Sequence, residues 1–306
     1  MSARPIRNLN TGVALARGAC PTLSAPMETG DGLLVRIVPS GSMVIDDFAA
    51  LCAAARTHGN GLMEITARGS LQIRGLTEIS APLFANTVEN LEIPFDDNVP
   101  VLVSPLPAHP NAQVQPRDLA AEIRSAIAAL GLDLAPKVSV VIDDGDPISL
   151  DELAADIRLR AVDGEAVEQL LVSVGGDHET ATLLGVTPIE HAASLIVDLL
   201  TTLAESGAQV RARDVVAREG LDRFLRAAGS RIATAPTYPA VRTTETIGLH
   251  RLHDGACAIG VALPFGQAHA LNLIALTRIA RANGAVWAAL APQRTLLLGP
   301  IDEMTA

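Results

Sequence analysis

Two distant segments of this 306-residue chain repeat one another at a constant offset. Residues 39–76 align without a gap to residues 264–301, because 264 − 39 is 225 and every matched pair keeps that spacing. The matched identities include turn residues and a helix-ending glycine: Pro39 with Pro264, Gly41 with Gly266, and Gly59 with Gly284. Solenoids repeat every roughly 20–50 residues, so this spacing indicates two related half-domains that pair about a pseudo-two-fold axis, with other material inserted between them. A ligand is expected where such halves meet.

Both copies predict the same order of elements. An apolar run gives a first strand, and a Pro-x-Gly turn ends it. Apolar residues at three- and four-residue spacing then predict helices over residues 46–58 and 269–283. Two short strands should follow in each copy, at residues 62–66 and 70–74 and again at 286–290 and 295–298. Strand, helix, strand, strand is most of a ferredoxin-like α+β sandwich, and residues 80–91 would add the second helix of the first copy.

The repeat divides the chain into four parts, and the fold class it predicts is α+β. Residues 1–92 would form an N-terminal arm and the first ferredoxin-like half, and residues 93–116 a proline-rich linker. Residues 117–239 would form an inserted α+β central domain, and residues 240–306 the second ferredoxin-like half.

The central domain carries weaker local signals. From its periodicity and turn residues we expect a helix at 117–132, a strand at 137–143 with a hairpin turn at 143–146, paired strands at 155–162 and 166–174, and helices at 188–205 and 214–228. Thr187 and Glu190 have the spacing of a capping box that would open the first of these two later helices.

Charge and composition argue against several classes of protein: nucleic-acid binding, membrane-spanning and disulfide-rich. The net charge of −11 argues against nucleic acid as a partner. Charged residues interrupt the apolar runs before the roughly 18 residues that a membrane span needs, and the N-terminus lacks the apolar core of a signal peptide. Three widely separated cysteines argue against a disulfide scaffold and for a reducing, cytoplasmic setting.

One predicted strand stands out by its charge. In the stretch 66–75, strand alternation would place four polar side chains on one face: Arg68, Ser70, Gln72 and Arg74. Two arginines on one face can grip carboxylates bidentately, although the same pattern also fits a solvated face of an antiparallel sheet. The second copy has uncharged residues at the matching places: Gln293, Thr295, Leu297 and Gly299.

Several motifs occur in a family-specific order. They are Cys20-Pro21, Pro26-Met27, the run 30–36, the stretch 66–75 with its pattern T-x-R-x-(T/S)-x-Q-x-x-G, Pro136-Lys137 and the run 263–267. In this order, across most of residues 18–301, the chain resembles the precorrin-3B synthase family of the nitrite and sulfite reductase superfamily. The resemblance implies two ferredoxin-like halves with an inserted domain, as the repeat does.

The resemblance also implies a tetrapyrrole site. Arg68 would match the arginine of the T-x-R pattern and Gln72 its glutamine, while Arg74 stands where sulfite reductases have histidine. Lys137 would match one of two lysines that face the macrocycle, and Ser139 occupies the place of the other. Arg68, Gln72, Arg74 and Lys137 are therefore the expected tetrapyrrole-binding residues, although Lys137 alone equally fits a solvated strand end.

The family holds a 4Fe–4S cluster on four cysteines in two close pairs, located after the second half. Cys20, Cys52 and Cys257 have no such pairing, and the sequence ends where that domain is expected to begin. We therefore expect no cofactor in this chain alone, and a partner chain as one source of the cluster domain.

The function implied by the resemblance is that of a precorrin-3B synthase-like oxidoreductase of aerobic cobalamin biosynthesis, or one piece of it, acting on precorrin-3A. Two alternatives stay open: a non-catalytic tetrapyrrole-binding or assembly protein derived from that family, and a nitrite/sulfite reductase-like oxidoreductase. Ser139 in the second lysine position favours corrinoid chemistry over sulfite reduction. Without the cluster cysteines, the sequence leaves open whether this chain is itself an enzyme.

Overall fold

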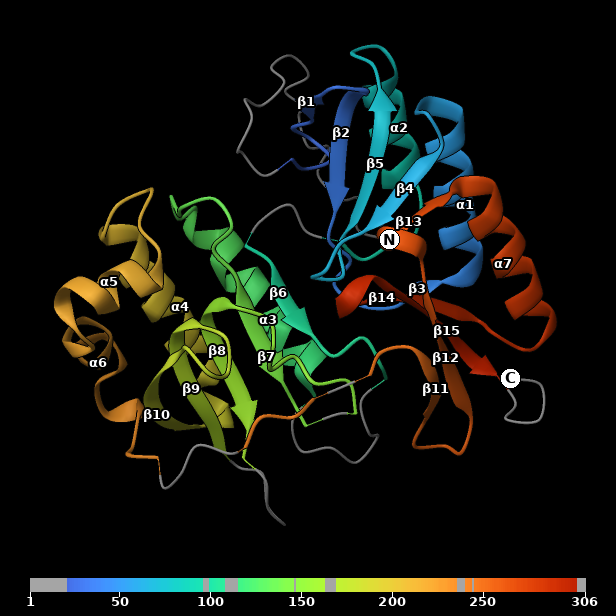
Figure 1. The fold of residues 1–306 in the computed structure, drawn as a ribbon. Coiled ribbons are helices and arrows are strands. Elements are labelled where there is room, and N and C mark those ends of the chain that lie inside the picture. Colours follow the sequence, from blue (N-terminus) through green and yellow to red (C-terminus); the bar gives the residue numbers. More distant parts are fainter. Residues whose placement is uncertain are drawn as a thin grey trace, which may run out of the picture.

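The structure, a computed structural model, describes residues 21–95, 99–107, 115–145, 147–162, 169–235, 240–243 and 245–301. Within these ranges the chain forms three five-stranded sheets and seven α-helices (Figure 1). No helix in the described part of the chain is long and apolar enough to cross a membrane.

Each half-domain is built from the elements that the repeat predicts. The first half contains β1 (Met27–Thr29), β2 (Gly32–Ile37), β3 (Met43–Val44), α1 (Ile45–His58), β4 (Leu62–Ile65), β5 (Leu71–Leu76) and α2 (Ser80–Glu89). The second half contains β11 (Gly248–Arg251), β12 (Cys257–Ala262), the turn η2 (Pro264–Gly266), β13 (Gln267–His269), α7 (Ala270–Ala282), β14 (Trp287–Ala291), the turn η3 (Pro292–Arg294) and β15 (Thr295–Ile301). The α+β class and the two related halves are thus confirmed, because β2 and β12 start 225 residues apart (257 − 32) and α1 and α7 do so as well (270 − 45).

The two halves exchange one short strand each. The first half's sheet has the order β1-β2-β5-β4-β13, so its last strand comes from the second half, and the second half's sheet has the order β11-β12-β15-β14-β3. The pairs are reciprocal: Val44 lies opposite Trp287, and His269 lies opposite Leu62, which are the same positions shifted by the repeat. A backbone hydrogen bond follows each pair, from Ile45 N–H to the Val286 oxygen (3.0 Å) and from Ala270 N–H to the Gly61 oxygen (2.8 Å). The exchange shows that the pseudo-two-fold relation extends to individual hydrogen bonds.

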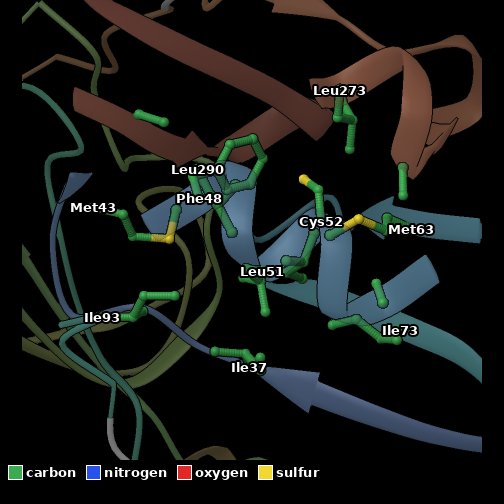
Figure 2. Close-up of a cluster of buried hydrophobic side chains, with 14 of the residues drawn as sticks. Ile37, Met43, Phe48, Leu51, Cys52, Met63, Ile73, Ile93, Leu273 and Leu290 are labelled. Atoms are coloured by element: carbon green, nitrogen blue, oxygen red, sulfur yellow. The ribbon is translucent and has the colours of Figure 1, made fainter. Parts of the chain in front are cut away.

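A single hydrophobic core joins the halves. Helices α1 and α7 pack against each other over it, and an ion pair between Asp46 and Arg281 (2.7 Å) bridges their exposed sides. Phe48 and Leu51 of α1 are fully buried beside Leu273 of α7 and Leu290 of β14 (Figure 2). At roughly 25 cal/mol per Å² of buried apolar surface, this shared core is the main force that holds the halves together.

The central domain is a separate α/β layer to the lower left of the halves in Figure 1. Its elements are β6 (Val101–Val103), α3 (Pro116–Leu130), β7 (Val140–Asp143), β8 (Ala155–Ala161), β9 (Gln169–Gly176), β10 (Thr182–Pro188), α4 (Ile189–Glu205), α5 (Ala212–Glu219) and α6 (Asp222–Ala228), followed by the 3-10 turn η1 (Gly229–Arg231). Its sheet has the order β10-β9-β8-β7-β6. Strand β6, its edge, lies inside the segment expected to be a linker.

Three local predictions in the central domain are wrong. The turn at residues 143–146 does not make a hairpin, because β7 and β8 are parallel and the Asp143 carboxylate instead caps the N–H groups of Gly145 and Leu150. The capping box at Thr187 is absent, since β10 continues through Pro188 and no side chain caps α4. The helix expected at 214–228 is two helices, which Gly220 separates with a φ of 67°.

Candidate functional site

The outer face of the first half's sheet, away from its helices, is polar. Arg36 on β2 and Glu64 on β4 both lie directly opposite Gln72 on β5, so the three side chains share one face. Arg74 follows two residues later on the same face, and Gln267 of the exchanged strand β13 lies opposite Glu64. We call these five residues the charged face. The intervening Leu71 and Ile73 are fully buried on the helix side, as the alternation predicts.

The equivalent face of the second half's sheet has no charge. Val261, Leu297, Gly299 and Ala289 occupy the positions of Arg36, Gln72, Arg74 and Glu64. Leu297 and Ala289 are buried in a small cluster with Leu106 and Ile148 of the central domain. The chain itself therefore covers one of the two related faces, while the other presents polar groups.

Arg36 is the cation of the charged face with the fewest contacts. Its Nε atom is buried, and no described residue accepts a hydrogen bond from it. Leaving a buried donor unpaired costs about 1–3 kcal/mol, and in native proteins such groups are few. The guanidinium is thus available to an acceptor from outside the described chain. Sequence reasoning missed Arg36 because it sits within the apolar run of β2; the signal that would have found it is that single charge.

Arg74 is shared between two carboxylates. Its guanidinium lies 3.6 Å from Asp31 and 3.6 Å from Glu64, and Gln267 donates to Glu64 at 3.2 Å. The hydroxyl of Thr29, with Arg74 as a weaker cause, holds the pKa of Asp31 below its ordinary value. These long ion pairs hold Arg74 extended over the face and leave its charge only partly compensated.

Arg68 does not lie on the strand face, so the expected row of four polar side chains is wrong at this position. It stands in the turn at residues 66–70, which closes through a hydrogen bond from Thr66 N–H to the Ser70 oxygen (2.8 Å) and a positive φ of 76° at Gly69. Ser70 is buried and contacts Thr66 rather than solvent. Instead of joining Gln72 and Arg74, Arg68 reaches across to the central domain.

The guanidinium of Arg68 joins the first half to the central domain. It donates to the Ala154 oxygen at 2.6 Å and to the Ser139 hydroxyl at 3.0 Å. Enclosure of the group, and then the nearby Arg211 guanidinium, lowers the pKa of Arg68, and Asp156 opposes them. Lys137 lies two residues before Ser139, exposed and with a φ of 72°, in the turn that leads into β7. Lys137 is thus linked to the Arg68 junction only along the chain, through Ser139.

The carboxylate of Asp156 holds together the residues around Arg68. Its buried carboxylate accepts hydrogen bonds from the N–H groups of Ser139 (3.1 Å) and Ala212 (3.0 Å) and from the guanidinium of Arg211 (2.9 and 2.7 Å). Bidentate carboxylate–arginine pairs fix the guanidinium plane, so Asp156 positions Arg211 beside Arg68. Arg211 is a second cation that the sequence did not indicate, because 55 residues (211 − 156) separate it from its partner.

A cavity of about 350 Å³ opens where the three parts of the chain meet. Its walls come from the turn at Arg68, the central-domain loop 149–154, the connecting residues Arg242 and Thr246, and the turn η3. Gln293 of η3 donates to Glu152 of the loop at 3.2 Å across this cavity. The hollow has both polar and apolar walls and includes Arg68, and residues of both halves line it, as the repeat predicts for a ligand site.

The described residues do not fit a 4Fe–4S cluster. Cys52 and Cys257 are both buried in the core of the halves, and burial raises the pKa of the Cys52 thiol to about 12. Cluster ligands are thiolates at short spacing, whereas Cys20 lies outside the described residues. Across the described ranges, no three histidine, cysteine or acidic side chains gather as a metal site.

Comparison with known proteins agrees with this architecture. Residues 25–90 match the nitrite/sulfite reductase ferredoxin-like half domain. Over 302 residues, 97% of this chain, the sequence is 37% identical to a precorrin-3B synthase from Sinorhizobium sp, of whose length the chain spans 64%. The structure of the Mycobacterium tuberculosis NirA protein shares the fold with a TM-score of 0.73 and 17% identity, over 89% of this chain and 54% of that one. The chain therefore carries the nitrite/sulfite reductase ferredoxin-like half domain, and along nearly all of its length it is similar to a precorrin-3B synthase.

Proposed function

We propose that this chain is a precorrin-3B synthase-like oxidoreductase of aerobic cobalamin biosynthesis, or one piece of such an enzyme, and that it binds an anionic tetrapyrrole, precorrin-3A. Two observations support the proposal: the relationship to precorrin-3B synthase and the charged face. We also propose a cytoplasmic setting, because Cys52 and Cys257 are unpaired thiols.

The observation that carries the binding proposal is the Arg36 side chain, whose Nε atom has no hydrogen-bond acceptor among the described residues. A chain with a net charge of −11 repels a polycarboxylate at long range, so local cations must supply the attraction. Arg36 and Arg74 lie on adjacent strands of one face, and arginine binds carboxylates through two parallel hydrogen bonds. Gln72 between them offers an amide donor to a third acceptor.

The central domain supplies the opposite side of the proposed site. Arg68 and Arg211 lie near one another there, with the Asp156 carboxylate bonded to Arg211, and the exposed Lys137 precedes Ser139 by two residues. A macrocycle with several carboxylate arms would bridge the charged face and this junction. Such bridging would use arginines from two different parts of the chain, of which Arg74 has only long ion pairs of 3.6 Å.

The redox step needs a group that the described residues do not hold. When bound, a 4Fe–4S cluster passes single electrons, and a partner chain that carries the cluster domain is the source we propose. The buried cysteines also support the second candidate, a non-catalytic tetrapyrrole-binding or assembly protein. Electron transfer to a bound tetrapyrrole, with and without such a partner, separates the two.

The binding proposal predicts a large effect from the two face arginines. Changing Arg36 and Arg74 together to glutamine removes two charged donors, each worth on the order of 1.5–3 kcal/mol. We expect the affinity for uroporphyrin, a stable tetrapyrrole with carboxylate arms, to fall at least about a hundredfold in isothermal titration. Arg278→Gln, on the exposed side of α7, is the matched control and should bind like the wild type. Unchanged affinity in the double variant would contradict the proposal.

A second prediction concerns the cluster. The 306-residue chain, purified alone and reconstituted anaerobically with iron and sulfide, should show neither the absorbance nor the paramagnetic signal of a 4Fe–4S cluster. The reason is that Cys52 and Cys257 lie in the core and offer no thiolate to solvent. Stoichiometric incorporation of four irons per chain would overturn this expectation.

A further inference from the structure

Strained backbone gathers around the proposed site. Four residues other than glycine have a positive φ in the described chain: Lys137, Phe265, Gln293 and Arg294. Each such conformation is strained, and in proteins these residues cluster where ligands bind. Gln293 lines the cavity beside Arg68, and Lys137 lies two residues before Ser139, which accepts a hydrogen bond from Arg68. Phe265 and Arg294 belong to the second half, which also supplies Gln267 to the charged face and Gln293 to the cavity wall.

Phe265 is the most exposed large apolar side chain in the described chain, with 90% of its surface accessible. Burying a phenylalanine ring stabilises a protein, but the Phe265 ring stays exposed while its backbone is held at a φ of 56°. An exposed aromatic ring on a strained backbone indicates that Phe265 contacts a ligand.

The turn that carries Phe265 lies against the charged face. A Cβ placed on the next residue, Gly266, would meet the Ile65 oxygen at 2.5 Å and the Cδ of Arg294 at 2.6 Å. One residue further, Gln267 donates to Glu64, which is itself the ion-pair partner of Arg74. Turn η2 is therefore wedged between the end of β4 and Arg294, at the rim of the charged face.

Arg294 is a cation with no partner in the described chain. Within the described ranges, neither a carboxylate nor a carbonyl oxygen accepts a hydrogen bond from it, and the residue is exposed. Its neighbour Gln293 donates its N–H to the Ala67 oxygen at 3.0 Å, which fixes turn η3 beside the turn of Arg68. The sequence comparison of the two copies found no cation on the predicted strand face of the second half, yet Arg294 supplies one from the turn.

The matching turn of the first half has different contacts. Ser40 is the counterpart of Phe265 (265 − 40 is 225). Its N–H and hydroxyl both donate to the Pro94 oxygen, at 2.7 and 3.0 Å, so the following chain covers that turn. The described chain provides no such cover for Phe265, whose ring and the neighbouring guanidinium together form an apolar surface beside a positive charge.

We propose that Phe265 and Arg294 are further tetrapyrrole contacts: the Phe265 ring packs on the macrocycle, and Arg294 binds one of its carboxylate arms. The ligand class this pair selects is a flat, largely apolar ring that carries anionic arms. This inference rests on the proposed function and adds to it that the second half-domain completes the site.

Titration of single variants with two probes tests the proposal. The probes are uroporphyrin and butane-1,2,3,4-tetracarboxylate, an acyclic anion without a ring. We expect Phe265→Ala to weaken uroporphyrin binding about tenfold or more while leaving tetracarboxylate binding within about twofold of the wild type. Arg294→Gln should weaken the binding of both probes by about tenfold. The controls are Ile279→Ala, an exposed apolar residue on α7, and Arg278→Gln on the same helix.

The outcomes separate this inference from the proposed function. If Phe265→Ala and Arg294→Gln bind uroporphyrin as the two α7 controls do, while the Arg36/Arg74 double variant loses affinity, then this inference is wrong and the proposed function stands. If the wild type does not bind uroporphyrin, both are overturned. If Phe265→Ala lowers the affinity for both probes equally, the proposed ring contact is also wrong, because an acyclic anion has no ring for Phe265 to cover.

Discussion

Asp156→Ala is expected to lower the free energy of unfolding by about 3–5 kcal/mol, because removing one partner of a buried ion pair leaves the other group uncompensated. Asp156 is 2% exposed and accepts hydrogen bonds from four donor atoms. The alanine variant therefore also leaves the N–H groups of Ser139 and Ala212 without this acceptor. The Arg211 guanidinium would lose the carboxylate that holds it beside Arg68. Chemical denaturation followed by circular dichroism measures the change.

The control for Asp156 is Asp198→Ala. Asp198 also pairs with an arginine, Arg231 at 2.6 Å, but its side chain is 51% exposed. Surface pairs of this kind are worth about 0–1 kcal/mol, so the control should unfold close to the wild type. If both variants unfold at the same denaturant concentration, the junction around Asp156 is not the fixed scaffold described above.

Phe48→Ala should cost a similar amount, about 3–5 kcal/mol, because it empties a ring-sized volume from a close-packed core. Phe48 is 0% exposed and lies among residues of both halves, including Leu273 and Leu290 (Figure 2). The substitution should therefore destabilise both halves and not only helix α1. Trp287, the single tryptophan of the chain, lies on β14 of the second half and reports on that half by its fluorescence.

The prediction is that Phe48→Ala shifts the Trp287 transition and the helix signal of circular dichroism together. The same substitution at the exposed Phe265 is the control, and it should change the unfolding free energy little. A Trp287 transition that stays in place while the helix signal shifts would mean that the halves unfold independently, contrary to a shared core.

The repeat allowed much of the half-domains to be predicted, because the first strand, the helix and the two strands after it are each indicated in both copies. The helices at residues 46–58 and 269–283 were placed within one residue at each end, and the two strands after each helix were found. Only short-range signals were available in the central domain, where there is no second copy. A parallel pair such as β7 and β8 depends on a crossover connection, and local turn residues at Asp143 favoured a hairpin instead.

The candidate site was harder to predict than the fold. Gln72 and Arg74 lie on one face as the alternation requires, but the turn at Gly69 takes Arg68 off the strand. Arg36 lies opposite Gln72 because of the register in which β2 pairs with β5, and the sequence alone does not reveal that register. The positions of Arg68 and Arg211 are fixed by hydrogen bonds to residues far away in the chain, Ser139 and Asp156 respectively.

The exchanged strands β3 and β13 give the paired halves the organisation of a symmetric homodimer enclosed in one polypeptide. Each half lends the other an edge strand through equivalent residues, which is how the two subunits of an isologous dimer contact one another. An ancestor with a single copy of the unit would have met the same hydrogen-bonding need by self-association. Within one chain the two copies need not stay identical: here one sheet face carries Arg36 and Arg74, while the inserted domain packs on the other.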